Sequence, residues 1–127
     1  MSYMLLIIEP PGQRRSRTAA EGRQAYASML RFGQELRDEG RLLAVESLAS
    51  QSGAVRVQMR QGKTQLLDGP FAEAKEMVGG FFLIDCGSLD EAIDIARRCP
   101  AAEWATVEVR AVAPCCDDSH APERSSP

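Results

Sequence analysis

The sequence predicts an α+β fold in which two helices cover one face of an antiparallel sheet. Two segments combine a helix-capping signal with apolar residues at helical spacing, and the apolar runs around them are typical of strands. The order is β-α-β, an inserted hairpin and then β-α-β, which most simply forms a ferredoxin-like sheet. The other face of such a sheet has no cover, although its strands are apolar. We therefore expect a homodimer that pairs these faces as a dimeric α+β barrel.

The first β-α-β unit opens with the strand Tyr3–Ile8, whose continuous apolarity predicts a buried central position. Thr18 and Glu21 have the spacing of a capping box, in which each side chain satisfies a free backbone N–H at a helix start. Gly40 is the expected helix stop, and Leu42–Leu48 is the second strand. The helix carries one apolar stripe, formed by Tyr26, Met29, Leu30, Gly33 and Leu36.

The inserted hairpin is predicted at residues 54–67. Residues 54–60 alternate between apolar and polar side chains, as in a half-exposed strand. Gln61 and Gly62 form a tight turn, and residues 64–67 return as the partner strand. The pattern leaves open whether this hairpin contributes to the dimer interface.

The second β-α-β unit begins with an apolar strand at residues 80–86. Ser88 and Glu91 predict a second capping box, and Pro100 ends the helix that follows. The last strand is predicted at Ala105–Val112. The buried face of the helix is expected to consist of Leu89, Ala92, Ile93 and Ala96.

The domain is expected to span residues 1–113, with residues 114–127 as a flexible tail rich in Pro and Ser. The tail holds Cys115, Cys116 and His120 close together, a composition that suits metals. Adjacent cysteines hold one tetrahedral ion poorly, however, so we expect neither a metal site nor a cofactor. Cys86 and Cys99 read as small buried apolar side chains.

Composition excludes several classes of function. Of the 127 residues, 44% are apolar and 26% charged, with a net charge of −3, so nothing draws the chain to nucleic acid. The cluster of Arg14, Arg15 and Arg17 is expected to be a solvated loop. The N-terminal apolar run is too short to span a bilayer and lacks the basic flank of a signal peptide, so we expect a cytoplasmic protein without membrane contact.

Six segments of the chain match a known family: "YMLLI", "LRDEGRLL" (Leu36–Leu43), "DGPFAEAKE" (Asp68–Glu76), "GGFFLID" (Gly79–Asp85), "SLDEAIDIA" (Ser88–Ala96) and "VEVRAV" (Val107–Val112). Through these segments the chain resembles the YCII-related proteins, and specifically their DGPF-motif branch, over roughly residues 3–112. The resemblance implies a ferredoxin-like fold, homodimerisation and a cleft beside the sheet. Many DGPF members are encoded near extracytoplasmic-function sigma factors, which implies a sigma factor as a partner.

Enzymes of the wider family have a histidine on the first helix and an aspartate before the proline that ends the second helix. In this chain Met29 occupies the histidine position, and Cys99 precedes Pro100. The only histidine is His120. Acid–base catalysis by such a pair therefore does not carry over. A thiol at a helix C-terminus faces the negative end of the helix dipole, so we expect Cys99 to be unreactive.

The loop Asp68-Gly69-Pro70-Phe71 has a structural and a functional interpretation. As a rigid corner, Asp68 would accept backbone hydrogen bonds, Gly69 and Pro70 would set the backbone, and Phe71 would fill an apolar hole. As a cleft wall, Asp68 would orient a substrate or act as a general base. Lys75 would then close over an anionic ligand. The glycine pair at 79 and 80 is expected to mark a bulge rather than a phosphate site.

Three hypotheses follow. The first is a non-catalytic or weakly catalytic homodimer that binds a small molecule or a protein partner beside the DGPF loop. The second is an isomerase, hydrolase or lyase that uses Asp68 or Glu73 together with Lys75. The third is an accessory protein of a sigma factor. The expected ligand-binding residues are Tyr26, Met29, Asp68, Gly69, Phe71 and Lys75.

Overall fold

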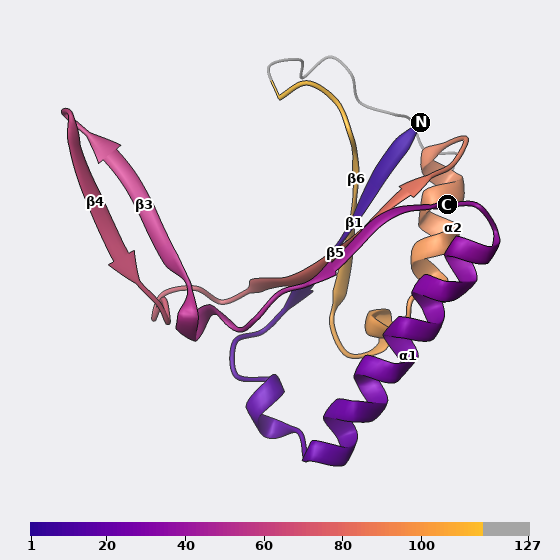
Figure 1. Ribbon diagram of the computed structural model, residues 1–127, viewed down its shortest axis with the longest axis horizontal. Coiled ribbons are helices and arrows are strands. Elements are labelled where there is room, and N and C mark those ends of the chain that lie inside the picture. Colours follow the sequence, from indigo (N-terminus) through magenta and orange to yellow (C-terminus); the bar gives the residue numbers. More distant parts are fainter. Residues whose placement is uncertain (116–127) are drawn as a thin grey trace.

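A four-stranded antiparallel sheet forms the centre of the molecule, and both helices lie on one of its faces (Figure 1). The computed structural model describes residues 1–115. The strand order β2-β5-β1-β6 is that of a ferredoxin-like sheet and confirms the predicted fold class. The elements are β1 (Ser2–Glu9), α1 (Ala19–Asp38), β2 (Leu42–Ser47), β3 (Val55–Arg60), β4 (Lys63–Asp68), β5 (Met77–Asp85), α2 (Leu89–Arg98) and β6 (Thr106–Ala111), with 3-10 turns η1 (Arg14–Ser16), η2 (Gln51–Gly53) and η3 (Pro100–Glu103).

Strand β1 is central, as predicted, and pairs with β5 on one side and β6 on the other. Its burial alternates, because successive side chains point to opposite faces of the sheet. The helix-facing side chains are at most 6% exposed: Tyr3, Leu5, Ile7 and Glu9. Phe82 of β5 meets Phe32 of α1 edge to face, with ring centroids 5.0 Å apart, and joins sheet to helix.

Helix α1 begins and ends as predicted. The Glu21 backbone N–H donates to Thr18 Oγ1 over 3.1 Å, and the Thr18 backbone N–H donates to Glu21 Oε1 over 2.8 Å, which completes the capping box. At the C-terminus Gly40 has φ of 73°, and the N–H of Arg41 donates to the carbonyl of Leu36, as in a Schellman motif.

The predicted buried stripe of α1 is wrong in its first half. Tyr26 and Leu30 are 56% and 57% exposed, whereas Phe32, which the prediction omitted, is buried with Gly33 and Leu36. The reason is that only the C-terminal half of α1 packs tightly on the sheet. The N-terminal half forms the wall of a cleft described below.

The second capping box is only half formed. The Glu91 backbone N–H donates to Ser88 Oγ, but the Glu91 carboxylate does not return the bond. Instead it accepts from the Gly87 backbone N–H and forms an ion pair with Arg41, which lies directly after α1. The buried face of α2 is also shifted, since Ile95 is buried and Ile93 only half-buried.

The β3–β4 hairpin stands away from the body, on the side of the sheet opposite the helices (Figure 1). Gln61 and Gly62 have φ of 53° and 75°, as in a type I′ turn. All twelve strand residues of the hairpin are exposed. The prediction of a half-exposed strand therefore does not hold for the single chain, because nothing within residues 1–115 covers its apolar side.

The predicted tail and its cysteine–histidine cluster fall mostly on residues 116–127, outside the described residues; Cys115 is exposed and unbonded to another cysteine. Within residues 1–115, neither helix is long and apolar enough to cross a membrane.

Candidate functional site

A cleft of about 500 Å³ lies between the N-terminal half of α1 and the end of the sheet. Small side chains create it, because Gly22 and Ala25 face the sheet where larger residues would fill the space. Its apolar walls include Met29, Leu30 and Trp104, and Tyr26 lies at its side. A volume of this size suits a small organic ligand.

The floor of the cleft holds an ion pair whose carboxylate is buried. Glu9 is 5% exposed, and Arg14 Nε donates to its Oε1 over 2.6 Å. The same guanidinium donates to the carbonyls of Leu48, over 2.7 Å, and Gly79, over 3.2 Å. Arg14 therefore clamps the ends of three neighbouring strands, and its charge is neutralised there. The prediction of a solvated loop is wrong for Arg14.

The glycine pair is explained by this clamp. A Cβ on Gly79 would lie 2.5 Å from Glu9 Oε2, and one on Gly80 would lie 2.7 Å from the carbonyl oxygen of Glu46. The register of β1 against β5 shifts at the same place. The prediction of a bulge and close packing is confirmed.

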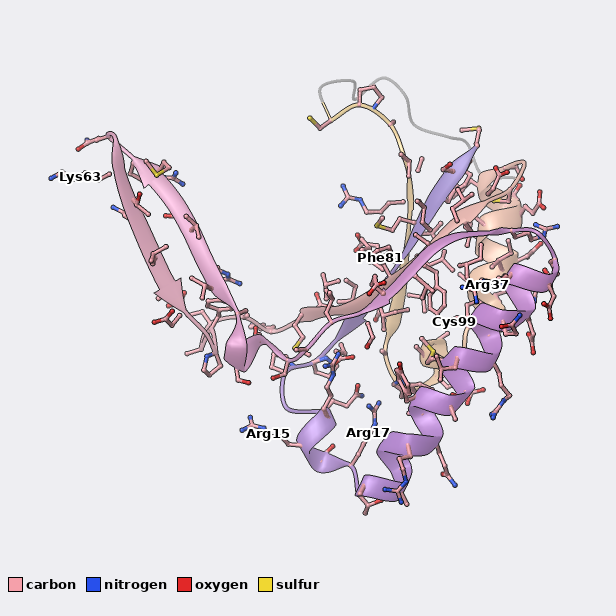
Figure 2. All side chains as sticks on the ribbon, in the orientation of Figure 1. Arg15, Arg17, Arg37, Lys63, Phe81 and Cys99 are labelled. Carbon is pink, nitrogen blue, oxygen red and sulfur yellow. The ribbon has the colours of Figure 1, made fainter. Side chains whose placement is uncertain are left out.

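Arg17 forms the positive rim of the cleft. Its guanidinium lies 5.6 Å from the centre of the Trp104 ring, and Gln13 donates to the Trp104 carbonyl over 2.6 Å. Figure 2 shows Arg15, by contrast, projecting outward from the η1 turn. Arg17 is thus a cation beside an aromatic wall, whereas Arg15 is solvated as predicted.

Met29 and Cys99, which occupy the positions of the family's histidine and aspartate, do come together. Their sulfur atoms are 3.9 Å apart. Cys99 is 1% exposed, and this burial raises the pKa of its thiol. The pair offers a polarizable apolar surface rather than an acid and a base.

The DGPF loop lies outside the lining of the cleft, at the base of the hairpin. The Gly69 N–H donates to the Ala54 carbonyl over 2.7 Å, and a Cβ on Gly69 would overlap the Gln51 carbonyl oxygen. Phe71 is buried, and the Arg56 guanidinium lies 3.8 Å from the centre of its ring. These contacts fit the structural interpretation, a corner that orients the hairpin.

The candidate catalytic residues Asp68, Glu73 and Lys75 are all exposed, and none of them lines the cleft. Of the expected ligand-binding residues, the cleft brings together only Tyr26 and Met29. Within residues 1–115, no group of three or more histidine, cysteine, aspartate or glutamate side chains could hold a metal ion.

The prediction missed Glu9, Arg14, Arg17 and Trp104. The alternation of side chains along β1 could have predicted that Glu9 is buried, because Glu9 shares a face with Leu5 and Ile7. A carboxylate on a buried face needs a cation, and Arg14 is five residues away. The sequence around Trp104 has no pattern that would predict its place in the cleft.

The fold and the cleft define a small ferredoxin-like α+β protein with a ligand-sized space beneath its first helix. The family model of the YCII-related domain matches residues 1–115, so the chain belongs to the YCII-related family. It is also similar to an uncharacterised protein of Rhizobium meliloti (strain 1021), with 45% identity over 78 residues. This match covers 60% of the chain and 63% of the relative, so the chain spans less than two thirds of that protein.

Proposed function

We propose that this protein is a homodimer of the DGPF branch of the family that binds a small molecule in the cleft beneath α1 and does not catalyse a reaction. The cleft carries the proposal. It combines apolar walls with the cation of Arg17, whereas the carboxylate on its floor, that of Glu9, is already paired with Arg14.

These features favour a ligand with a flat apolar body and one anionic group. The body would lie against Met29, Leu30 and the Trp104 ring, and the anion would meet Arg17. A guanidinium that is only half-buried and held by one long hydrogen bond, 3.5 Å from Gln13 Oε1, can turn toward an anion.

Binding rather than catalysis is supported by the chemistry of the cleft. The positions that hold a histidine and an aspartate in related enzymes hold Met29 and the buried thiol of Cys99. The candidate catalytic residues of the enzyme hypothesis, Asp68, Glu73 and Lys75, do not line this cleft.

A melting-temperature panel tests this function. We would use benzoate, phenylacetate and naphthoate, each beside its neutral amide. We expect at least one acid to raise the melting temperature more than its amide does. Arg17→Gln should lower the affinity for that acid by about tenfold. Arg15→Gln is the matched control and should leave binding unchanged. No shift with any compound, or equal losses in both variants, would contradict the proposal.

A second proposal rests on the family resemblance alone: the protein is cytoplasmic and binds a sigma factor as an accessory protein. No residue of the cleft favours this role. A purified pair of the protein and the sigma factor encoded beside its gene would test it. A lack of association in equilibrium sedimentation would remove it.

A further inference from the structure

The β3–β4 hairpin is two-faced. Residues that pair directly across an antiparallel ladder point to the same side, and Val57 pairs with Leu66 while Gln58 pairs with Gln65. One face therefore carries most of the apolar side chains and the other most of the polar ones. The exceptions are Leu67, opposite Arg56 on the polar face, and Asp68, opposite Val55 on the apolar face. The apolar face consists mainly of Val55, Val57, Met59 and Leu66, each between 52% and 65% exposed.

Such a hairpin is poorly stabilised by its own chain. A two-stranded ribbon is marginal in water unless its apolar face packs on something. Within residues 1–115, no ion pair ties it to the body, and its attachment is at its base. There, Arg56 of the polar face packs on Phe71, and Gly69 bonds to Ala54. This attachment leaves the apolar face turned away from the chain's own core.

The same chain leaves a second apolar surface uncovered. The side of the sheet opposite the helices, which we call the open sheet face, carries half-buried or exposed apolar side chains from β1 and β5. Register places them together: Met4 opposite Leu83, Leu6 opposite Phe81, and Ile8 opposite Val78. The hairpin projects on this side of the sheet (Figure 1).

The hairpin and the rest of the chain have opposite net charges. The hairpin, residues 55–68, carries Arg56, Arg60 and Lys63 on its polar face and Asp68 on its apolar face, a net charge of +2. The whole chain carries −3, which leaves −5 on the remainder. On the open sheet face, Glu46 lies opposite Phe81, and Glu108 lies opposite Leu6. Glu108 forms an ion pair of 3.9 Å with Arg110 of the same face, which leaves Glu46 as the carboxylate without an ion pair there among residues 1–115. Figure 2 shows Lys63 at the tip of the hairpin, where it reaches farthest from its own body.

We infer that the hairpin is an arm whose apolar face packs on the open sheet face of a second copy of this chain. The inference rests on the proposed homodimer and adds the surface that holds it. In a two-fold symmetric dimer, the arm of each copy packs on the open sheet face of the other. The two arms and the two open sheet faces are then all buried, and no such surface is left free for a third copy. A stable interface needs roughly 800 Å² per partner, and we expect the arm and the open sheet face of each copy to supply it together.

The dissociation constant of the full-length protein, measured by analytical ultracentrifugation, tests the arm. Val57→Asp with Leu66→Asp places two charges on the apolar face and should weaken association at least about 100-fold. Gln58→Asp with Gln65→Asp places the same charges at the neighbouring ladder pair on the polar face. This control should change the dissociation constant by less than about threefold. Both pairs are exposed in the single chain, so circular dichroism should show both variants folded.

The outcomes separate the arm from the dimer. A wild-type protein that stays monomeric up to about 100 μM would overturn both the arm and the proposed homodimer. A dimer that both double variants leave intact, or weaken equally, would overturn the arm and keep the dimer.

A photo-crosslinking residue at position 57, in mixed light and heavy-isotope dimers, gives the second readout. Crosslinks from one copy to residues 4–8 or 78–83 of the other support the arm. Crosslinks confined within one copy overturn it.

Discussion

The helix-covered face of the sheet and the β3–β4 hairpin use the same kinds of side chain in opposite surroundings. Leu5 and Ile84 are fully buried under the helices, whereas Val57 and Leu66 of the hairpin are 63% and 65% exposed. In both regions alternate strand residues point to one face, but this spacing does not say whether that face will be covered. The body completes its own core, whereas nothing within residues 1–115 covers the apolar face of the hairpin.

The largest expected effect separates the core from the hairpin. Phe32→Ala removes a buried ring that packs on Phe82 and should cost about 3–5 kcal/mol of unfolding free energy. Leu66→Ala, measured in dilute solution where single chains prevail, should cost under about 0.5 kcal/mol. Urea unfolding at two protein concentrations measures both. Equal losses would mean that the hairpin belongs to the core of the single chain.

The clamp at the floor of the cleft should give the next largest effect. Arg14→Met leaves the buried Glu9 carboxylate without its cation and should cost about 2–3 kcal/mol. Glu9→Gln keeps an oxygen that accepts from Arg14 and should cost less. Urea unfolding compares the two variants, and an equal or larger loss for Glu9→Gln would show that the charge pair does not stabilise the strand ends.

The joint between body and hairpin gives a smaller effect. Gly69→Ala introduces a methyl group where the Gln51 carbonyl lies and should cost about 1–3 kcal/mol. Gly53→Ala is the control, because no atom lies within 4 Å of the added carbon. Thermal unfolding ranks the two. If Gly69→Ala and Gly53→Ala have the same melting temperature, the DGPF loop does not hold the hairpin rigidly.

The smallest effect is a pH dependence confined to the body. The Gly87 N–H and the Arg41 guanidinium lower the pKa of the Glu91 carboxyl. Because the folded pKa is lowered, the stabilisation is present above the unfolded pKa and is lost as the pH falls through the folded value. Glu91→Gln should therefore be less stable than wild type near neutral pH, and the gap should close in acid. Unfolding midpoints from about pH 7 to about pH 3 would show this, and a gap independent of pH would contradict it.

Much of the fold could be predicted because its signals are local. The Thr18–Glu21 capping box and the Gly40 stop depend only on residues within a few positions of one another, and both formed as expected. The Ser88–Glu91 box used the same spacing and formed only half, because the Glu91 carboxylate bonds instead to the Gly87 N–H and to Arg41, which is far away in sequence. Local rules fail where a distant partner offers a stronger interaction.

The candidate site was harder to predict. Tyr26 and Met29 were expected near a ligand, but Trp104 joins them from a turn after α2 that has no pattern of its own. The DGPF loop has a distinctive sequence, which drew attention to Asp68 and Lys75. Its constraints serve the joint at Gly69 and Phe71 rather than the cleft.

The sequence by itself determined the order of the elements, their caps, and which side of each strand is apolar, since these follow from backbone geometry and neighbouring side chains. Only the tertiary structure decided which apolar faces are covered. The helices reach one face of the sheet, small residues beneath α1 leave a cleft, and the corner at Gly69 points the hairpin away from its own core. Burial depends on what lies opposite a side chain in space, and that is a property of the folded chain.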